Sequence, residues 1–247
     1  MLKHGRDKLI KMLTWVINRC LNGEETPQQW KVAYISSIHK KGSKKECSNY
    51  RGISVTSVMS RLCGKILRDL IEKENKDEEK KSGYRTGRSC TDNIFLMKQV
   101  IGKRNATDQE SNLLFVDLTK AYGNIPIPKF WEGLGESNIN NTLIKALKNL
   151  YGNTAQAKIG NKLFHPFNIT KGLSQGCCTF PTLCKIYVRK ALEEWKRKCW
   201  GMGIALENTA LCTLQLADDQ VVLAGDKEDL EYMTRKLTLI LLTWRIG

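Results

Sequence analysis

Two short apolar runs on either side of an acidic pair constrain the fold of this chain more than any other feature. The runs Leu211–Leu216 and Val221–Ala224 flank Asp218 and Asp219, and their length and composition predict two strands joined at a tight turn. A third apolar run, Leu113–Leu118, predicts another strand, buried inside the protein.

Six further segments carry apolar residues at helical spacing, which places those residues on one face of an amphipathic helix. The segments are Leu9–Leu21, Leu62–Ile71, Ile94–Ile101, Leu143–Leu150, Thr182–Leu192 and Leu230–Leu241. In addition, Trp30–Ile38 predicts a strand that leads into a lysine-rich turn, and Gln156–Phe164 predicts a hairpin around Gly160. Helices and strands mixed in this order predict one α+β unit with two lobes.

The chain is strongly basic. Its 247 residues include 40 Lys and Arg against 25 Asp and Glu, which gives a formal net charge of +15. Such an excess is typical of a protein that binds a polyanion, and a merely basic protein without such a partner is the equal alternative. No apolar run approaches the roughly 20 residues needed to span a membrane, so we expect no membrane partner.

The nine cysteines predict neither disulfides nor a zinc site. They form no C-x-x-C pair, and the three histidines lie far apart in sequence. Most of the cysteines stand among apolar residues, so we interpret them as small core residues of an intracellular protein in a reducing compartment, either nucleus or cytoplasm.

Acidic residues at the ends of the predicted strands are the candidates for chemistry. Asp218 and Asp219 repel each other at their turn, and a divalent cation would relieve that repulsion. An Asp pair at a hairpin is, by itself, more often a plain turn signal, and Asp117 could equally cap a following helix. Together, the strands could place these carboxylates side by side, where they would hold two Mg²⁺ ions.

Six segments of the chain resemble, in the same order, motifs of the non-LTR (LINE-type) retrotransposon reverse transcriptases. They are WK to KKG over residues 30–42, NYRGIS over 49–54, SGYRTGRSCTD over 82–92, FVDLTKAY over 115–122, GLSQGC with the following PTL and IY over 172–187, and ADD over 217–219. One such match is weak, but six in the family's order cover most of the chain. The chain resembles a truncated and somewhat degenerate copy of such an enzyme.

The resemblance implies a fold. It is α+β: a right-hand polymerase palm, whose antiparallel sheet is backed by helices, with a partial fingers subdomain and without a thumb. Residues 1–106 would form the partial fingers and residues 107–247 the palm, within one reverse transcriptase domain of about residues 30–247.

The resemblance also implies an activity, RNA-directed DNA polymerisation. Such a nucleotidyltransferase adds dNTPs to the 3′-hydroxyl of a DNA primer on an RNA template by two-metal phosphoryl transfer, with Mg²⁺ and in some cases Mn²⁺. Asp117, Asp218 and Asp219 would be the catalytic residues, and together with the Leu118 carbonyl they would bind the metal ions.

Further residues match family positions that contact nucleotide or nucleic acid. The positions that would contact the incoming nucleotide are Lys40, Lys41, Arg51, Tyr122, Gln175 and Gly176, with Tyr122 as the steric gate against a 2′-hydroxyl. Arg85 and Arg88 would contact template phosphates, with a purely structural role as the equal alternative.

The chain departs from the family pattern at four positions near these motifs. Leu216 stands where Phe or Tyr is usual, Gly123 where Asp is usual, Phe180 where Ser is usual and Cys184 where Phe is usual. None of these removes a metal ligand. The main alternative is therefore a catalytically silent nucleic-acid-binding remnant; a metalloenzyme unrelated to nucleic acid would leave the basic charge unexplained.

Overall fold

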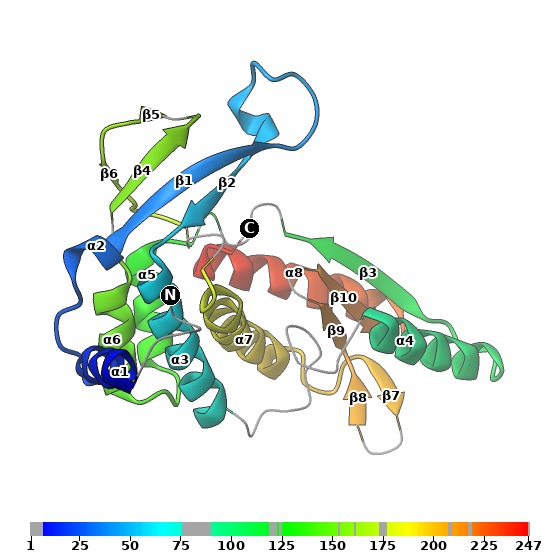
Figure 1. The fold of residues 1–247 in the computed structure, drawn as a ribbon. Coiled ribbons are helices and arrows are strands. Elements are labelled where there is room, and N and C mark those ends of the chain that lie inside the picture. Colours follow the sequence, from blue (N-terminus) through cyan, green and yellow to red (C-terminus); the bar gives the residue numbers. More distant parts are fainter. Residues whose placement is uncertain are drawn as a thin grey trace. The chain divides into compact units, whose positions relative to one another are not determined.

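The computed structural model describes residues 7–75, 90–118, 123, 125–152, 154–160, 162–172, 177–206, 209–216 and 219–246 (Figure 1). The chain forms two compact units, each assembled from two stretches of sequence. The first unit comprises Met1–Lys76 and Leu134–Thr182, and the second comprises Asp77–Gly133 and Leu183–Gly247. The boundary falls inside α5 (Ile127–Gly135) and α7 (Phe180–Lys198). The division of the chain into fingers and palm at residue 106 stays a prediction.

The first unit contains a five-stranded sheet. β1 (Val32–His39) lies between β2 (Tyr50–Val55) and β4 (Thr154–Ile159), and the short strands β5 (Lys162–Leu163) and β6 (Phe167–Asn168) pair with β4. β1 and β4 run parallel, whereas the other pairs are antiparallel. The predicted hairpin is confirmed, because Lys158 pairs with Leu163 and Gly160 adopts a φ of +59° between them.

The helices of the first unit share an apolar core. They are α1 (Asp7–Leu21), α2 (Gln28–Lys31), α3 (Val58–Glu74) and α6 (Asn141–Leu150), and α6 contacts the other three. Leu67 of α3 and Leu147 of α6 are fully buried in this core. The predicted strand was wrong at its start: Trp30 lies buried in α2, where its N–H donates to the Pro27 carbonyl, and the strand begins only at Val32.

The second unit contains a three-stranded antiparallel sheet in the order β3-β10-β9. These strands are β3 (Asn112–Asp117), β10 (Asp219–Ala224) and β9 (Thr213–Leu216), and a separate hairpin consists of β7 (Ile204–Leu206) and β8 (Thr209–Leu211). The helices are α4 (Cys90–Asn105), most of α5 and of α7, and α8 (Lys227–Trp244). The predicted strand Val221–Ala224 is confirmed within β10, as is the antiparallel sheet with helices against it. The run Leu211–Leu216 was predicted as one strand, but it is divided at Cys212, because Leu211 ends β8 and pairs with Ile204 of β7.

The two faces of this sheet are covered by different helices. On one face Gln220, Val222 and Ala224 are buried, and α8 contacts both β10 and β3. On the other face, Leu214 and Leu223 form a buried cluster with Val100 of α4. This alternation along β10 follows from the two-residue period of a strand.

Burial of β3 differs from the expectation. The run Leu113–Leu118 was predicted to be a buried strand, but Phe115 is 68% exposed. Leu113 packs against the cluster beneath α4, while the end of the strand near Asp117 stays open. An apolar run predicts that a strand forms, but it does not predict how much of that strand a neighbouring helix covers.

All nine cysteines lie in the described ranges and are free. Cys20, Cys63, Cys184 and Cys199 are buried as expected, whereas Cys47 and Cys90 are exposed and are not core residues. Among the described residues, none of the helices is long and apolar enough to cross a membrane.

Candidate active site

Two carboxylates meet at one end of the sheet in the second unit. Asp117 is the last residue of β3 and Asp219 is the first residue of β10, and the two are directly paired across these antiparallel strands. Directly opposed residues project to the same face of a sheet, with Cβ atoms about 4.5–5.5 Å apart. Both side chains are exposed. Two negative charges are therefore held as neighbours at the open end of the sheet.

Side-chain hydrogen bonds hold the sheet in this register. The Asn93 side chain on α4 donates to the Gln215 carbonyl on β9 at 2.9 Å. The guanidinium of Arg104, also on α4, donates to the carbonyls of Glu110, just before β3, and Gly225, just after β10. On the opposite face, Gln220 donates to the Thr213 hydroxyl at 3.1 Å. Helix α4 thereby ties together both ends of the sheet that carries the carboxylates.

A cavity of about 310 Å³ opens beside the two carboxylates. Its walls are mostly apolar, and Asp117 and Asp219 provide its charged groups. The lining residues from α4 are Cys90, Asn93, Ile94 and Met97, and those from the sheet include Phe115, Leu214 and Val221. This volume lies at the lower end of the range typical of small-molecule sites.

The carboxylate pair fits a hard divalent cation. Like charges placed directly opposite destabilise a pair of strands, and carboxylate oxygens are the ligands that Mg²⁺ prefers. Within the described ranges no group of three or more His, Cys, Asp or Glu side chains could hold a metal ion. Asp218, the third carboxylate of the prediction, lies outside those ranges.

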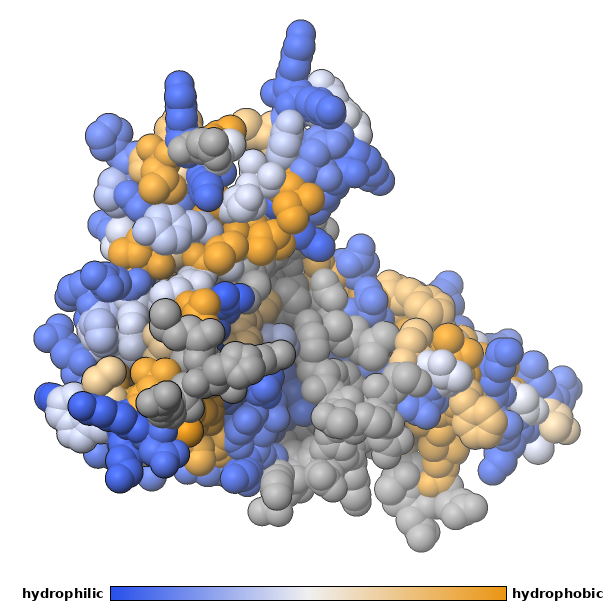
Figure 2. Space-filling model, in the orientation of Figure 1, coloured by the Kyte–Doolittle hydropathy of each residue, from blue (hydrophilic) through white to orange (hydrophobic). Residues whose placement is uncertain are grey.

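The predicted phosphate-binding residues Lys40, Lys41 and Arg51 lie in the first unit. β1 and β2 form a hairpin in which Ile38 pairs with Arg51, and Lys40 and Lys41 begin the loop at its end (Figure 1). All three side chains are exposed. Figure 2 shows hydrophilic side chains gathered at this loop.

Neighbouring side chains hold the backbone of this loop in place. The Lys40 N–H donates to the Asn49 carbonyl at 2.8 Å, and the Asn49 side chain donates to the Ser43 carbonyl at 2.9 Å. The Tyr50 hydroxyl donates to the Lys44 carbonyl at 2.9 Å. Gly42 has a φ of +81°, and a Cβ there would lie 2.7 Å from the Asn49 side-chain nitrogen. The lysines therefore project from a preformed loop.

Several predicted site residues lie outside the described ranges. They are Arg85, Arg88, Tyr122, Asp218, Gln175 and Gly176. Leu118 is described and directly follows β3, next to Asp117. The residues on both sides of the segment 173–176 are described, and those that follow it are tightly held.

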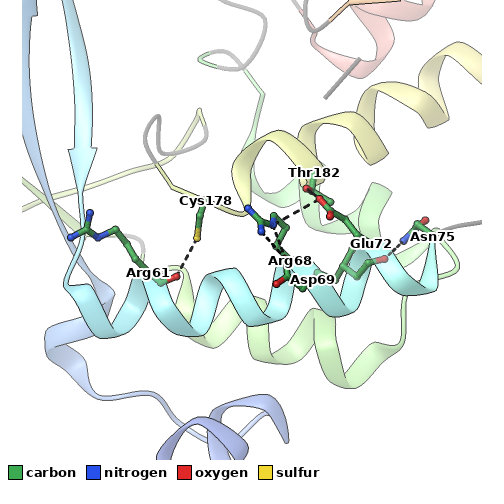
Figure 3. Close-up of polar contacts among 8 residues, drawn as sticks. Arg61, Arg68, Asp69, Glu72, Asn75, Cys178 and Thr182 are labelled. Carbon is green, nitrogen blue, oxygen red and sulfur yellow. Dashed lines mark hydrogen bonds and ion pairs between the residues drawn. The ribbon is translucent and has the colours of Figure 1, made fainter. Parts of the chain in front are cut away.

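The segment Cys177–Thr182 is anchored to helices of the first unit. The Cys178 thiol donates to the Arg61 carbonyl of α3 at 3.3 Å, and the Thr182 hydroxyl donates to the Glu72 carboxylate at 2.6 Å (Figure 3). Gly64 makes room for this approach, because a Cβ there would lie 3.1 Å from the Cys178 sulfur. Thr179 is fully buried and hydrogen-bonds with the Tyr151 hydroxyl at 3.0 Å.

Comparison with known proteins assigns the chain to a family. Residues 38–246 match the family model described as reverse transcriptase (RNA-dependent DNA polymerase). The chain belongs to the reverse transcriptase family. Its curated relatives place it with the non-LTR retrotransposon type, as the six motifs implied.

Two of these relatives show how much of a longer protein this reverse transcriptase domain matches. A probable RNA-directed DNA polymerase from transposon X-element of Drosophila melanogaster is 26% identical over 188 residues, which are 72% of this chain and 20% of the relative. A 149 kDa protein of transposon TX1 from Xenopus laevis is 22% identical over 225 residues, or 87% of this chain and 17% of the relative. The reverse transcriptase domain spans a fifth or less of both relatives.

Solved structures confirm the fold. A telomerase from Candida albicans, in complex with a fragment of telomeric RNA, is 12% identical and superposes with a TM-score of 0.62, covering 96% of this chain and 44% of the telomerase. Apo telomerase from Candida tropicalis is 14% identical with a TM-score of 0.62, covering 97% of this chain and 47% of that protein. The reverse transcriptase domain therefore has the right-hand polymerase fold.

Sequence reasoning missed the residues that support this candidate site. Asn93, Arg104, Asn49 and Tyr50 act on backbone carbonyls, and such partners leave no pattern in one sequence. Asn49 and Tyr50 were recognised only as part of a family motif, without a role. The sequence feature that could have indicated this role is their position at the far end of the loop that Lys40 and Lys41 begin, because a side chain that closes a loop lies near its end.

Proposed function

We propose that this domain catalyses RNA-directed DNA synthesis at the paired carboxylates of the second unit. The observation that carries the proposal is the direct pairing of Asp117 with Asp219 across β3 and β10, within a chain of the reverse transcriptase family. Asp218 precedes Asp219 in sequence and would complete the set of carboxylates.

Reverse transcriptases generally use divalent metal ions, and carboxylate oxygens are the ligands that such ions prefer. Asp117, Asp218, Asp219 and the Leu118 carbonyl would hold two Mg²⁺ ions, which activate the primer 3′-hydroxyl and neutralise charge on the leaving pyrophosphate. Asp117 ends β3 and Asp219 begins β10, so these two residues are held side by side by the hydrogen bonds of one sheet. Fixed ligands lose little entropy when a cation binds.

The remaining residues would position substrates. Lys40, Lys41 and Arg51 would contact the triphosphate, with Arg51 suited to bidentate contact. Gln175 and Gly176 would lie against the nucleotide, and Tyr122 would exclude a 2′-hydroxyl. Arg85 and Arg88 would contact phosphates of the RNA template, and the net charge of +15 supports such a polyanionic partner.

Primer extension on poly(rA)/oligo(dT) tests the proposal. With enzyme in excess over primer, the purified chain should add dTTP when Mg²⁺ is present and should stop when a chelator is added. Asp117→Asn and Asp219→Asn should each abolish addition, because each removes one charge from the ligand set. Glu136→Gln is the matched control, because it removes an exposed negative charge that lies outside the sheet.

The main competing function is that of a nucleic-acid-binding remnant. If primer–template binds the chain but no nucleotide is added under single-turnover conditions, the catalytic proposal is wrong and the remnant is correct. Activity that survives Asp117→Asn would also contradict it, since chemistry would then not depend on these carboxylates.

A further inference from the structure

The two adjacent cysteines after the segment 173–176 lie in unlike surroundings. Cys177 is half-buried, and its sulfur lies 3.1 Å from the Thr179 hydroxyl. That hydroxyl in turn lies 3.0 Å from the hydroxyl of Tyr151, which follows α6. A tyrosine that donates to the threonine leaves the threonine proton free to point at the Cys177 sulfur. Two hydroxyl groups in series therefore favour negative charge on that sulfur.

Cys178 is held as a thiol. Its S–H donates to the Arg61 carbonyl (Figure 3). A carbonyl oxygen only accepts hydrogen bonds, so this contact requires that Cys178 keep its proton. The cation that acts on Cys178 is Arg68 of α3, which is paired with Asp69 at 2.7 Å and lies 3.9 Å from Glu72. The cation is thus largely matched by two carboxylates on its own helix. Of the two sulfurs, Cys177 is the one whose surroundings suit a thiolate.

The helix that follows the two cysteines also favours negative charge on the Cys177 sulfur. Cys177 also lies three residues before the start of α7, where the helix dipole favours an anion.

We propose that Cys177 is a modification site for small soft electrophiles, with Thr179 and Tyr151 as the groups that activate it. With an alkyl iodide, a sulfur–carbon bond forms and the carbon–iodine bond breaks, and iodide leaves with the electron pair. With hydrogen peroxide, the sulfur attacks one oxygen and the O–O bond breaks; hydroxide leaves and takes up a proton as water, and Cys177 is oxidised to a sulfenic acid.

The site follows directly from the segment that would carry Gln175 and Gly176. If the proposed function is correct, a group added to Cys177 also displaces Thr179 from Tyr151 and weakens dNTP binding. Modification itself does not rest on the proposed function, because its readout is labelling of one sulfur.

Labelling with iodoacetamide over a range of pH, read by peptide mass spectrometry, tests the proposal on the full chain. The same thiol in urea-unfolded protein is the internal control, with an ordinary pKa of about 8.5. In the folded protein the rate at Cys177 should reach half its maximum at a clearly lower pH than in the unfolded protein. Exposed Cys47 serves as the accessibility control and buried Cys184 as the protected one.

Two variants separate activation from simple exposure. Tyr151→Phe and Thr179→Val remove the hydroxyl groups in turn, and each should move the Cys177 labelling midpoint to higher pH. Hydrogen peroxide followed by dimedone should tag the same residue. If Cys177 labels with the same pH midpoint in folded and unfolded protein, or no faster than Cys184 at every pH, the proposal is wrong. An unchanged midpoint in Tyr151→Phe, which keeps the ring, would also contradict it.

Discussion

Asp117 and Asp219 lie directly opposite each other on neighbouring antiparallel strands, at the same open end of one sheet. They are separated by about a hundred residues of sequence, yet the register of β3 and β10 makes them nearest neighbours. A pair of like charges in this arrangement opposes strand pairing, and the structure retains it next to a cavity.

Neutralising Asp219 should weaken metal binding without lowering the stability of the metal-free chain. In chelator, Asp219→Asn should leave the free energy of unfolding unchanged or raise it, because the repulsion with Asp117 is gone. Saturating Mg²⁺ should stabilise the wild-type chain by about 1–3 kcal/mol and the variant by less. Thermal unfolding with and without Mg²⁺ measures both effects. Equal stabilisation of wild type and variant would show that the ion binds elsewhere.

Removing the Tyr50 hydroxyl should loosen the lysine loop without unfolding the sheet. Tyr50→Phe loses the hydrogen bond to the Lys44 carbonyl and keeps the ring that packs edge-on against His39, whose ring centroid is 5.2 Å away. Hydrogen exchange of the loop amides should become faster. If the loop contacts the triphosphate, the KM for dNTP should rise while kcat changes little. Tyr34→Phe, on the same sheet, is the control and should leave both measurements unchanged.

Phe180 and Cys184 should behave as a coupled pair. They stand one turn apart on α7, both are buried, and the family has a small residue at the first position and a large one at the second. Cys184→Phe alone should destabilise by about 1–3 kcal/mol through overpacking. Phe180→Ser alone should cost about 3–5 kcal/mol through the cavity that it leaves. The double variant should lose clearly less stability than the sum of the two single variants, because the added ring can fill the cavity left by the removed one. Urea unfolding of the wild type and the three variants measures this, and additive losses would contradict it.

Charge on the β1–β2 loop should dominate the salt dependence of nucleic-acid binding. Replacing Lys40 and Lys41 by Gln removes two cations, so the slope of log K against log salt for an RNA–DNA heteroduplex should fall by about 1–2. Lys227→Gln, at an exposed position on α8, is the matched control. Fluorescence anisotropy at several salt concentrations measures the slope. A slope that is the same in all three proteins would place the contacts outside this loop.

Local signals in the sequence were sufficient for most secondary structure. The apolar spacing in Leu230–Leu241 predicted α8, and the glycine turn at Gly160 predicted the hairpin of β4 and β5. These elements depend on residues close together in the chain, so their periodicity records which face is buried. Trp30 was one exception, because the helical turn that follows Pro27 overrides the strand preference of an aromatic residue.

The candidate catalytic residues needed the family motifs as well. An aspartate at a strand end has several ordinary roles, and only the order of six motifs singled out Asp117, Asp218 and Asp219. The family pattern named these carboxylates before any fold was known, and it named the lysines of the β1–β2 loop in the same way. Their roles in catalysis stay predictions.

The sequence by itself determined most of the helices and strands and the motifs that the chain carries. Only the tertiary structure decided that Asp117 pairs with Asp219, that β1 runs parallel to β4, and that Phe115 is exposed while Leu113 on the same face is covered. Each of these depends on the register or reach of a partner that is distant in sequence. Propensity and periodicity depend on a few neighbouring residues. Strand pairing depends on the apolar surface that the whole sheet buries, and no single segment of the sequence predicts that quantity.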